Sequence, residues 1–259
     1  MRSPFAQPRV ADTKPPKARP SRHLIVFFTS ALIASFLTLA LSAHGDNAPA
    51  GKPAAPGPAT KPAEAKWQSL FDGKTMGKWS VSDFAGHGEP RVEDGALQLP
   101  FGEQLTGVTY TGEVPKINYE VELEAQKVDG ADFFCGLTFP VGDSFASLIV
   151  GGWGGSVVGI SSLDDKDAAH NDTRTARRFD TGKWYKIRLR VMPDKLQAWV
   201  NEEKVVDVVT TGKKISTRRE IDAGKPFGLS SYQTTAAIRD IRIRVLPAGE
   251  APAKVSGNP

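Results

Sequence analysis

The sequence predicts an all-β protein in which two antiparallel sheets pack as a jelly-roll sandwich. The clearest evidence lies in residues 182–208, where apolar and charged residues alternate with the period of two that a half-buried strand requires. Polar turns at Pro193 and Asn201 divide this stretch into a meander of three strands. Short apolar runs with Gly, Pro and Asp turns recur along the chain, and no segment of ten or more residues shows sustained helical spacing.

The expected strands follow an apolar cluster that begins at Trp67. Within residues 92–99, Asp94-Gly95 is a strong hairpin signal, because this dipeptide favours the tight turns that join antiparallel strands. Residues 133–141 and 145–150 are apolar on both faces, as central strands covered from both sides would be. Further strands are expected at residues 107–111, 118–128, 157–161, 227–232 and 236–245.

Four segments are expected along the chain. Residues 24–43 carry no charge and follow a basic leader, so residues 1–43 form either a secretory signal peptide or a membrane anchor. Both interpretations export the rest of the chain, and the membrane is a partner only through residues 24–43. The other expected segments are a disordered Ala/Pro-rich linker at 44–65, the sandwich domain at 66–247 and a disordered tail at 248–259.

Charge and cysteine content exclude several classes of function. Six of the 33 basic residues but only one of the 29 acidic residues lie in residues 1–43, so the remainder holds 27 basic and 28 acidic residues, a net charge of −1. We therefore expect no nucleic-acid partner. Cys135 is the only cysteine, which rules out an internal disulfide, and its apolar neighbours predict a buried, inert thiol.

The richest polar stretch is residues 161–178, which follows an expected strand. Asp164, Asp165 and Asp167 offer the oxygen ligands that calcium, the one candidate cofactor, would need, although their spacing matches no standard motif. Asp165 or Asp167 could instead form a catalytic acid–base pair with His170. A solvated loop without a chemical role is the other interpretation.

Trp153 stands between two pairs of glycines, Gly151-Gly152 and Gly154-Gly155. An exposed ring at this position could stack on the apolar face of a sugar, with Arg174 or Arg177 in a polar rim that orients the substrate. The alternative is a wide hairpin whose tryptophan folds back as a lid over the sandwich.

Glu120, Glu122 and Glu124 share one face of the expected strand at 118–128. Three carboxylates at alternate positions are typical of some sandwich glycosidases. Ordinary pairing with basic residues on a neighbouring strand, such as Lys186 and Arg190, is the interpretation that we favour.

Several segments, taken in order, resemble the 3-keto-disaccharide hydrolase domain family across about residues 66–246. They are FDGKTMGKW, VEDGALQL, NYEVELEAQ, GKWYKIRLRV, LQAWVNEEKVVDV and FGLSSYQTTAAIRDIRIRV. The resemblance implies a concanavalin A-like jelly roll of the lectin and glucanase type, and action on glycosides. Family members place ligand-contacting groups after the GL dipeptide of the last segment, which implies a substrate-binding role for Tyr232 and Gln233.

These observations predict an exported, carbohydrate-active protein whose partner is a glycan or oligosaccharide. As an enzyme it would be a glycoside hydrolase that acts on 3-keto-disaccharides or related glycosides. The alternative is a non-catalytic carbohydrate-binding or cell-surface module on the same fold.

Overall fold

The computed structural model describes residues 65–247, all of which belong to one compact unit. The expected signal peptide or anchor at 1–43, nearly all of the linker and the tail lie outside these residues. Within residues 65–247, no helix is long and apolar enough to span a membrane.

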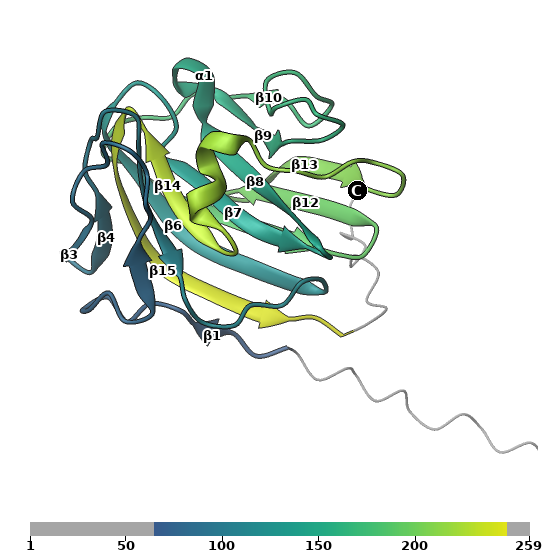
Figure 1. Ribbon diagram of the computed structural model, residues 1–259, viewed down its shortest axis with the longest axis horizontal. Coiled ribbons are helices and arrows are strands. Elements are labelled where there is room, and N and C mark those ends of the chain that lie inside the picture. The colour runs from purple at the N-terminus through teal and green to yellow at the C-terminus, as the bar shows by residue number, and fades with distance from the viewer. Residues whose placement is uncertain (1–64, 248–259) are drawn as a thin grey trace, which may run out of the picture. The chain divides into compact units, whose positions relative to one another are not determined.

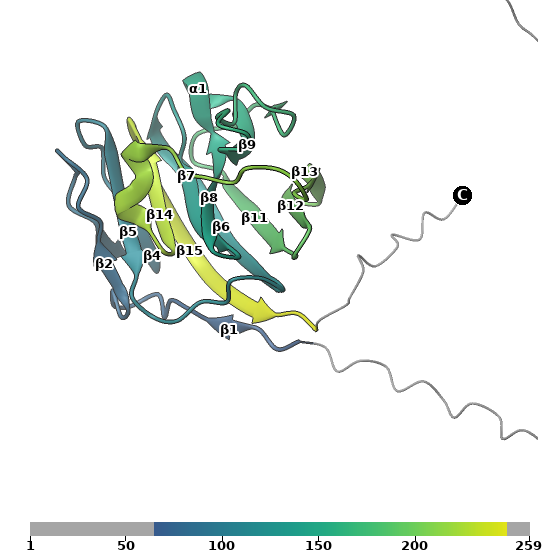
Figure 2. The ribbon, with the colours of Figure 1, turned by 45° about the vertical axis from the view of Figure 1, so that its right-hand side comes forward.

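The first of two antiparallel sheets contains the first and last strands of the domain. Its strands are β1 (Gln68–Ser69), β3 (Arg91–Glu93), β4 (Ala96–Leu99), β6 (Tyr119–Gly130), β11 (Trp184–Val191), β12 (Lys195–Val200), β13 (Glu203–Val209) and β15 (Thr234–Val245). They lie in the order β13-β12-β11-β6-β15-β4-β3, and β1 pairs with β15 (Figure 2).

The second sheet covers the first, which confirms the expected jelly-roll sandwich (Figure 1). Its strands are β2 (Trp79–Val81), β5 (Leu105–Tyr110), β7 (Cys135–Val141), β8 (Ser144–Gly151), β9 (Val157–Ser161), β10 (Thr175–Ala176) and β14 (Gly228–Tyr232). Their order is β10-β9-β8-β7-β14-β5-β2. Two short helical turns, α1 (Gly152–Gly155) and η1 (Arg219–Gly224), adjoin this sheet.

The alternation in the sequence decides which face of each strand is buried. In β11, and in β6 as far as Ala125, every second residue is apolar and lies in the core, as Leu189 and Leu123 do, while the residues between them face outward. The β3–β4 hairpin turns at Asp94 and Gly95, whose φ angles of 52° and 76° are those of the turn that its sequence predicts.

The core between the sheets contains a cluster of aromatic rings. Phe134 is fully buried, and its ring centroid lies 5.1 Å from that of Phe179 and 5.9 Å from that of Tyr185. Burial raises the pKa of the Cys135 thiol to about 12, so this thiol is protonated at neutral pH and the prediction of an inert core cysteine is confirmed.

The three glutamates of β6 form a charged ladder on the outer face of the first sheet. Glu120 lies between Arg190 and Arg244, and Glu122 lies between Lys186 and Arg242. Pairing across neighbouring strands therefore accounts for these glutamates, although Glu120 and Glu122 are buried beneath their partners rather than solvated.

We expect this ladder to make the domain sensitive to acid. Burial would raise the pKa of Glu122, but hydrogen bonds from Arg242 and Lys186 outweigh burial and hold the pKa below its ordinary value of 4.5. Because folding lowers this pKa, the stabilisation is fully present above pH 4.5 and is lost as the pH falls through the lowered value. Melting temperatures measured down to pH 3 should fall more steeply for the wild type than for Glu122→Gln, and parallel curves would contradict this assignment.

Candidate functional site

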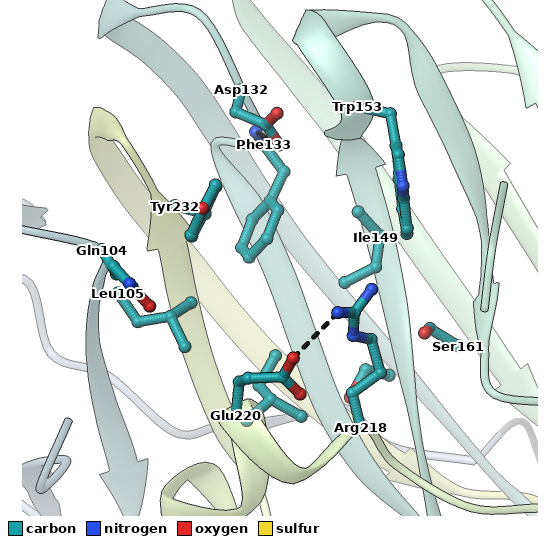
Figure 3. Close-up of a pocket in the computed structure, with 12 residues that line it drawn as sticks. Gln104, Leu105, Asp132, Phe133, Ile149, Trp153, Ser161, Arg218, Glu220 and Tyr232 are labelled. Carbon is teal, nitrogen blue, oxygen red and sulfur yellow. Dashed lines mark hydrogen bonds and ion pairs between the residues drawn. The ribbon is translucent and has the colours of Figure 1, made fainter. Parts of the chain in front are cut away.

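A pocket of about 320 Å³ opens on the outer face of the second sheet (Figure 3). We call it the Trp153 pocket. It is lined by Gln104, Leu105, Asp132, Phe133, Ser147, Ile149, Trp153, Ser161, Arg218, Glu220, Ile221 and Tyr232. The volume is at the lower end of the roughly 300–1,000 Å³ that ligand pockets span, which suits a small ligand rather than a long chain.

The floor of the pocket comes from the strand residues that alternate with the core. Ser147 and Ser161 are cross-strand neighbours on β8 and β9, and their side chains point away from the sandwich interior. Gly136 and Gly159 flank Ile149 on this face, and their lack of a side chain lets Phe133 and Ala168 pack close to the sheet. The floor therefore combines hydroxyl groups with the apolar side chain of Ile149.

The segment η1 crosses the same face and closes one side of the pocket. The Thr109 hydroxyl donates to the Ala223 carbonyl over 3.0 Å and so attaches η1 to β5. Gly228 on β14 lets η1 approach that strand closely as well, because a Cβ atom at Gly228 would lie 2.3 Å from the Gly224 carbonyl oxygen. The fold thus brings Glu220 and Ile221 over the sheet.

Trp153 forms the opposite wall from an unusual turn between β8 and β9. Gly151, Trp153 and Gly154 have φ angles of 82°, 49° and 82°, a left-handed path that glycine adopts readily. Asp132 holds the turn, because its carboxylate accepts hydrogen bonds from the backbone N–H of Gly154 at 2.9 Å and of Phe133 at 2.8 Å. Trp153 is 37% exposed as a residue, and its ring faces the pocket (Figure 3).

A charged pair lies across the pocket from Trp153. Arg218 Nη2 donates to Glu220 Oε1 over 2.8 Å (Figure 3). This hydrogen bond is the main reason why the pKa of Glu220 is lowered and that of Arg218 is raised. Both side chains are therefore ionised at neutral pH, and they present a fixed donor and a fixed acceptor to a ligand.

A histidine–carboxylate pair adjoins this charged pair. His170 Nδ1 lies 2.6 Å from Asp167 Oδ1, and Asp167 Oδ2 lies 3.4 Å from Arg218 Nη1. Asp167 is mostly buried, whereas the His170 side chain is 70% exposed. Neither residue lines the pocket, and the contact between Asp167 and Arg218 is what connects the pair to it.

Comparison with known protein families identifies the domain. A model of the 3-keto-alpha-glucoside-1,2-lyase-like domain family matches residues 66–244, well over half of the chain. The chain belongs to this family. The resemblance seen in the sequence is thereby confirmed, and the protein is a carbohydrate-active jelly-roll domain. No curated protein matches the sequence.

Solved structures with a related architecture are distant. The carbohydrate-binding module CBM66 from Bacillus subtilis is 12% identical over 64% of this chain and 95% of its own, with a TM-score of 0.46. A putative glycosyl hydrolase from Parabacteroides distasonis is 15% identical over 70% and 94%, also with a TM-score of 0.46. The Bacillus licheniformis beta-glucanase is 10% identical over 71% and 99%, with a TM-score of 0.47.

In this 3-keto-alpha-glucoside-1,2-lyase-like domain, two of the residues predicted to bind substrate line the same pocket. They are Trp153 and Tyr232, and the Tyr232 ring stacks on Phe133 with centroids 5.8 Å apart. Arg174 and Gln233 are exposed and do not line the pocket. Their predicted roles as substrate-binding residues gain no support from this geometry.

The acidic residues predicted as calcium ligands point to different partners. Asp164 pairs with Lys213 at 3.4 Å and Asp165 with Lys214 at 2.8 Å, whereas Asp167 turns towards Arg218. Within residues 65–247, no three His, Cys, Asp or Glu side chains are grouped so that they could hold a metal ion. Asp165 does not join the Asp167–His170 pair, since its carboxylate accepts a hydrogen bond from Lys214 instead.

The residues that the sequence did not indicate come from separate parts of the chain: Asp132 lies between β6 and β7, Arg218 immediately precedes η1, and Glu220 lies in η1. Asp132, Arg218 and Glu220 carry no local motif, and only folding brings them to one pocket. The glycines around Trp153 did indicate a site residue in the sequence. They also form a left-handed turn, which the sequence alone did not reveal.

Proposed function

We propose that this chain binds a small glycan in the Trp153 pocket and cleaves the glycosidic bond of a 3-keto-disaccharide or related glycoside. The observation that carries the proposal is the combination, in one pocket of suitable size, of an aromatic wall with a fixed Arg218–Glu220 pair. Sugar rings have apolar C–H faces that stack on aromatic rings and hydroxyl edges that need both donors and acceptors. We also propose that the domain acts outside the cytoplasm, in keeping with the export that residues 24–43 predict.

Trp153 and the stacked Phe133–Tyr232 pair would hold the two apolar sides of a sugar ring. Arg218 would donate to ring oxygens, and Glu220 would accept from hydroxyls. Ser147 and Ser161 on the floor can do either, because a hydroxyl is both donor and acceptor.

The name of the family, a 1,2-lyase of 3-keto-alpha-glucosides, suggests how the bond would break. A ketone at C3 acidifies the hydrogen on C2. Removal of that proton, with loss of the oxygen substituent from C1, leaves a C1=C2 double bond, and the departing alkoxide takes up a proton; addition of water to the double bond would complete a hydrolysis. We assign the proton transfers to His170, whose Nδ1 is held by Asp167 so that Nε2 remains for the substrate. Arg218 would stabilise the negative charge that develops on the ketone oxygen.

One observation favours a second candidate, a glycan-binding module without catalysis. The two carboxylates that line the pocket already have partners, since Asp132 accepts from two backbone N–H groups and Glu220 accepts from Arg218. A pocket with committed carboxylates can bind a sugar, but it has no free acid or base of its own.

The test compares plain and 3-keto disaccharides with the purified protein and measures both released sugar and binding. We expect His170→Ala to lower turnover by about 10²-fold or more with little change in ligand affinity, because a general acid–base residue contributes roughly 10²–10⁴-fold. Trp153→Ala should weaken binding. His87→Ala, at a half-buried histidine in a loop of its own, is the control and should behave as the wild type.

The outcomes separate the two candidates. Release of sugar that His170→Ala abolishes would support the enzyme. Saturable binding without release, lost in Trp153→Ala, would support the binding module, and failure of every tested sugar to bind or react would contradict both.

A further inference from the structure

Basic side chains gather on the outer face of the first sheet, which is the opposite side of the sandwich from the Trp153 pocket. They project from β11 and β15, the two strands that flank β6. We call this surface the arginine face, and its basic members are Lys186, Arg188, Arg190, Arg239, Arg242 and Arg244.

The arginine face carries more positive than negative charge. The three glutamates of β6 lie among its six cations, and two of these glutamates are each shared by two cations. Asp240, which pairs with Arg239 at 3.7 Å, is a fourth carboxylate, so six cations against four carboxylates leave an excess of two positive charges. Because the chain beyond residue 43 has a net charge of −1, this face concentrates positive charge against the overall balance.

Arg188 has a special position in this ladder. Among the described residues it forms no ion pair, and its guanidinium instead lies 4.0 Å from the centroid of the Trp199 ring. A half-buried guanidinium that is not engaged by a carboxylate retains its donors for an anion from outside.

Three tryptophan rings lie among these cations. Each is partly exposed, so it offers ring surface as well as a place for an arginine to stack. The pairs are Trp199 with Arg188 at 4.0 Å, Trp184 with Arg239 at 4.0 Å, and Trp67 with Arg244 at 4.6 Å and Arg242 at 4.9 Å. A groove of about 410 Å³ lies beside Trp67, and its lining combines Lys186 and Arg242 with the carboxylates of Glu122, Glu124 and Asp240.

We propose that the arginine face binds a strand of acidic polysaccharide, one whose sugars carry carboxylate or sulfate groups. Arginines two residues apart on a strand stand roughly 7 Å apart, so they can meet anionic groups that are spaced along a polymer. Guanidinium groups bind carboxylate and sulfate oxygens through paired hydrogen bonds, and the tryptophan rings offer stacking surfaces to sugar faces. The site is separate from the Trp153 pocket and does not depend on its function.

The carboxylates on this face favour a glycan over other polyanions. Duplex DNA carries one charge per roughly 1.7 Å of its axis, and so dense a row of phosphates would be repelled by Glu124 and Asp240, the exposed carboxylates of this face. A polysaccharide has fewer charges along its length, and its hydroxyl groups can donate to Glu124, whose side chain is 32% exposed.

Calorimetry with the whole protein tests the proposal, using polygalacturonate for carboxylates, dextran sulfate for sulfates and neutral dextran as the uncharged polymer. We expect one or both acidic polymers to bind, more weakly as salt is raised, while neutral dextran does not bind. Arg188→Ala should raise the Kd by roughly tenfold, as expected for loss of a hydrogen bond to a charged group. Lys186→Ala provides a second variant if Arg188→Ala does not fold.

Two controls keep the result specific. Arg178→Ala removes the same charge from the loop after β10, where the side chain is 94% exposed, and should leave the Kd unchanged. Trp153→Ala should also leave it unchanged, which separates this site from the pocket. The proposal is overturned if Arg178→Ala weakens binding as much as Arg188→Ala, or if neutral dextran binds as well as the acidic polymers. It is also overturned if duplex DNA or anionic lipid vesicles bind more tightly than polygalacturonate and dextran sulfate do.

Discussion

Glu120→Gln is expected to lower the free energy of unfolding by about 3 kcal/mol, the lower end of the cost of breaking a buried ion pair. Glu120 has no exposed surface, and its carboxylate accepts from Arg190 Nε at 2.6 Å and from Arg244 Nε at 2.7 Å. Glutamine would leave two guanidinium groups, 16% and 24% exposed, without a counter-charge and would turn an amide N–H₂ towards one of them. Urea denaturation followed by fluorescence measures the change.

Glu124→Gln is the matched control on the same strand. Its side chain is 32% exposed and pairs across the sheet with Arg239 at 2.8 Å, so water can replace much of the lost interaction. We expect a loss below about 1 kcal/mol. Equal losses for the two variants would show that burial does not set the strength of this ladder.

Phe134→Ala is expected to cost about 3–5 kcal/mol, as other truncations of buried phenylalanine do. The ring is fully enclosed by Phe179, Tyr185 and the backbone around Gly151, so its removal leaves a cavity that the two sheets cannot close. The midpoint of urea unfolding should fall. A loss under about 1 kcal/mol would mean that the core collapses to fill the space.

The neighbouring Phe133→Ala should have the opposite effects, a small loss of stability and a clear loss of ligand affinity. Phe133 points to the other side of its segment, where it stacks on Tyr232 and lines the Trp153 pocket. Because it is only partly buried, its loss should affect stability much less than that of Phe134, while the affinity for a pocket ligand falls. Adjacent phenylalanines would thus separate the energetics of the core from those of the site.

The fold could be predicted because it depends on patterns that are local in sequence. The alternation in β6 and β11 determines their buried faces, and Asp94-Gly95 determines the position of a hairpin. The short segment η1 could not be predicted, since six residues without helical periodicity are held in place by contacts with β5 and β14.

The candidate site was predictable only where one segment supplies its own signal. Trp153 is marked by flanking glycines, and Asp167 and His170 are three positions apart in one polar loop. Arg218 and Glu220 gave no such signal, because their importance arises from where η1 lies across the second sheet. The same is true of Asp132, whose two backbone hydrogen bonds join segments that are separated by about twenty residues.

The pairing of β1 with β15 places the two ends of the domain side by side. Gln68 is the partner of Ile243 and Ser69 that of Arg242, so both ends belong to the first sheet, in which β1 runs beside β15 (Figure 2). The Trp153 pocket opens from the second sheet. A domain with adjoining ends can be inserted into a surface loop of another protein or circularly permuted with little strain. Attachment at either end, to a host protein or to a sensor chip, would leave the pocket accessible.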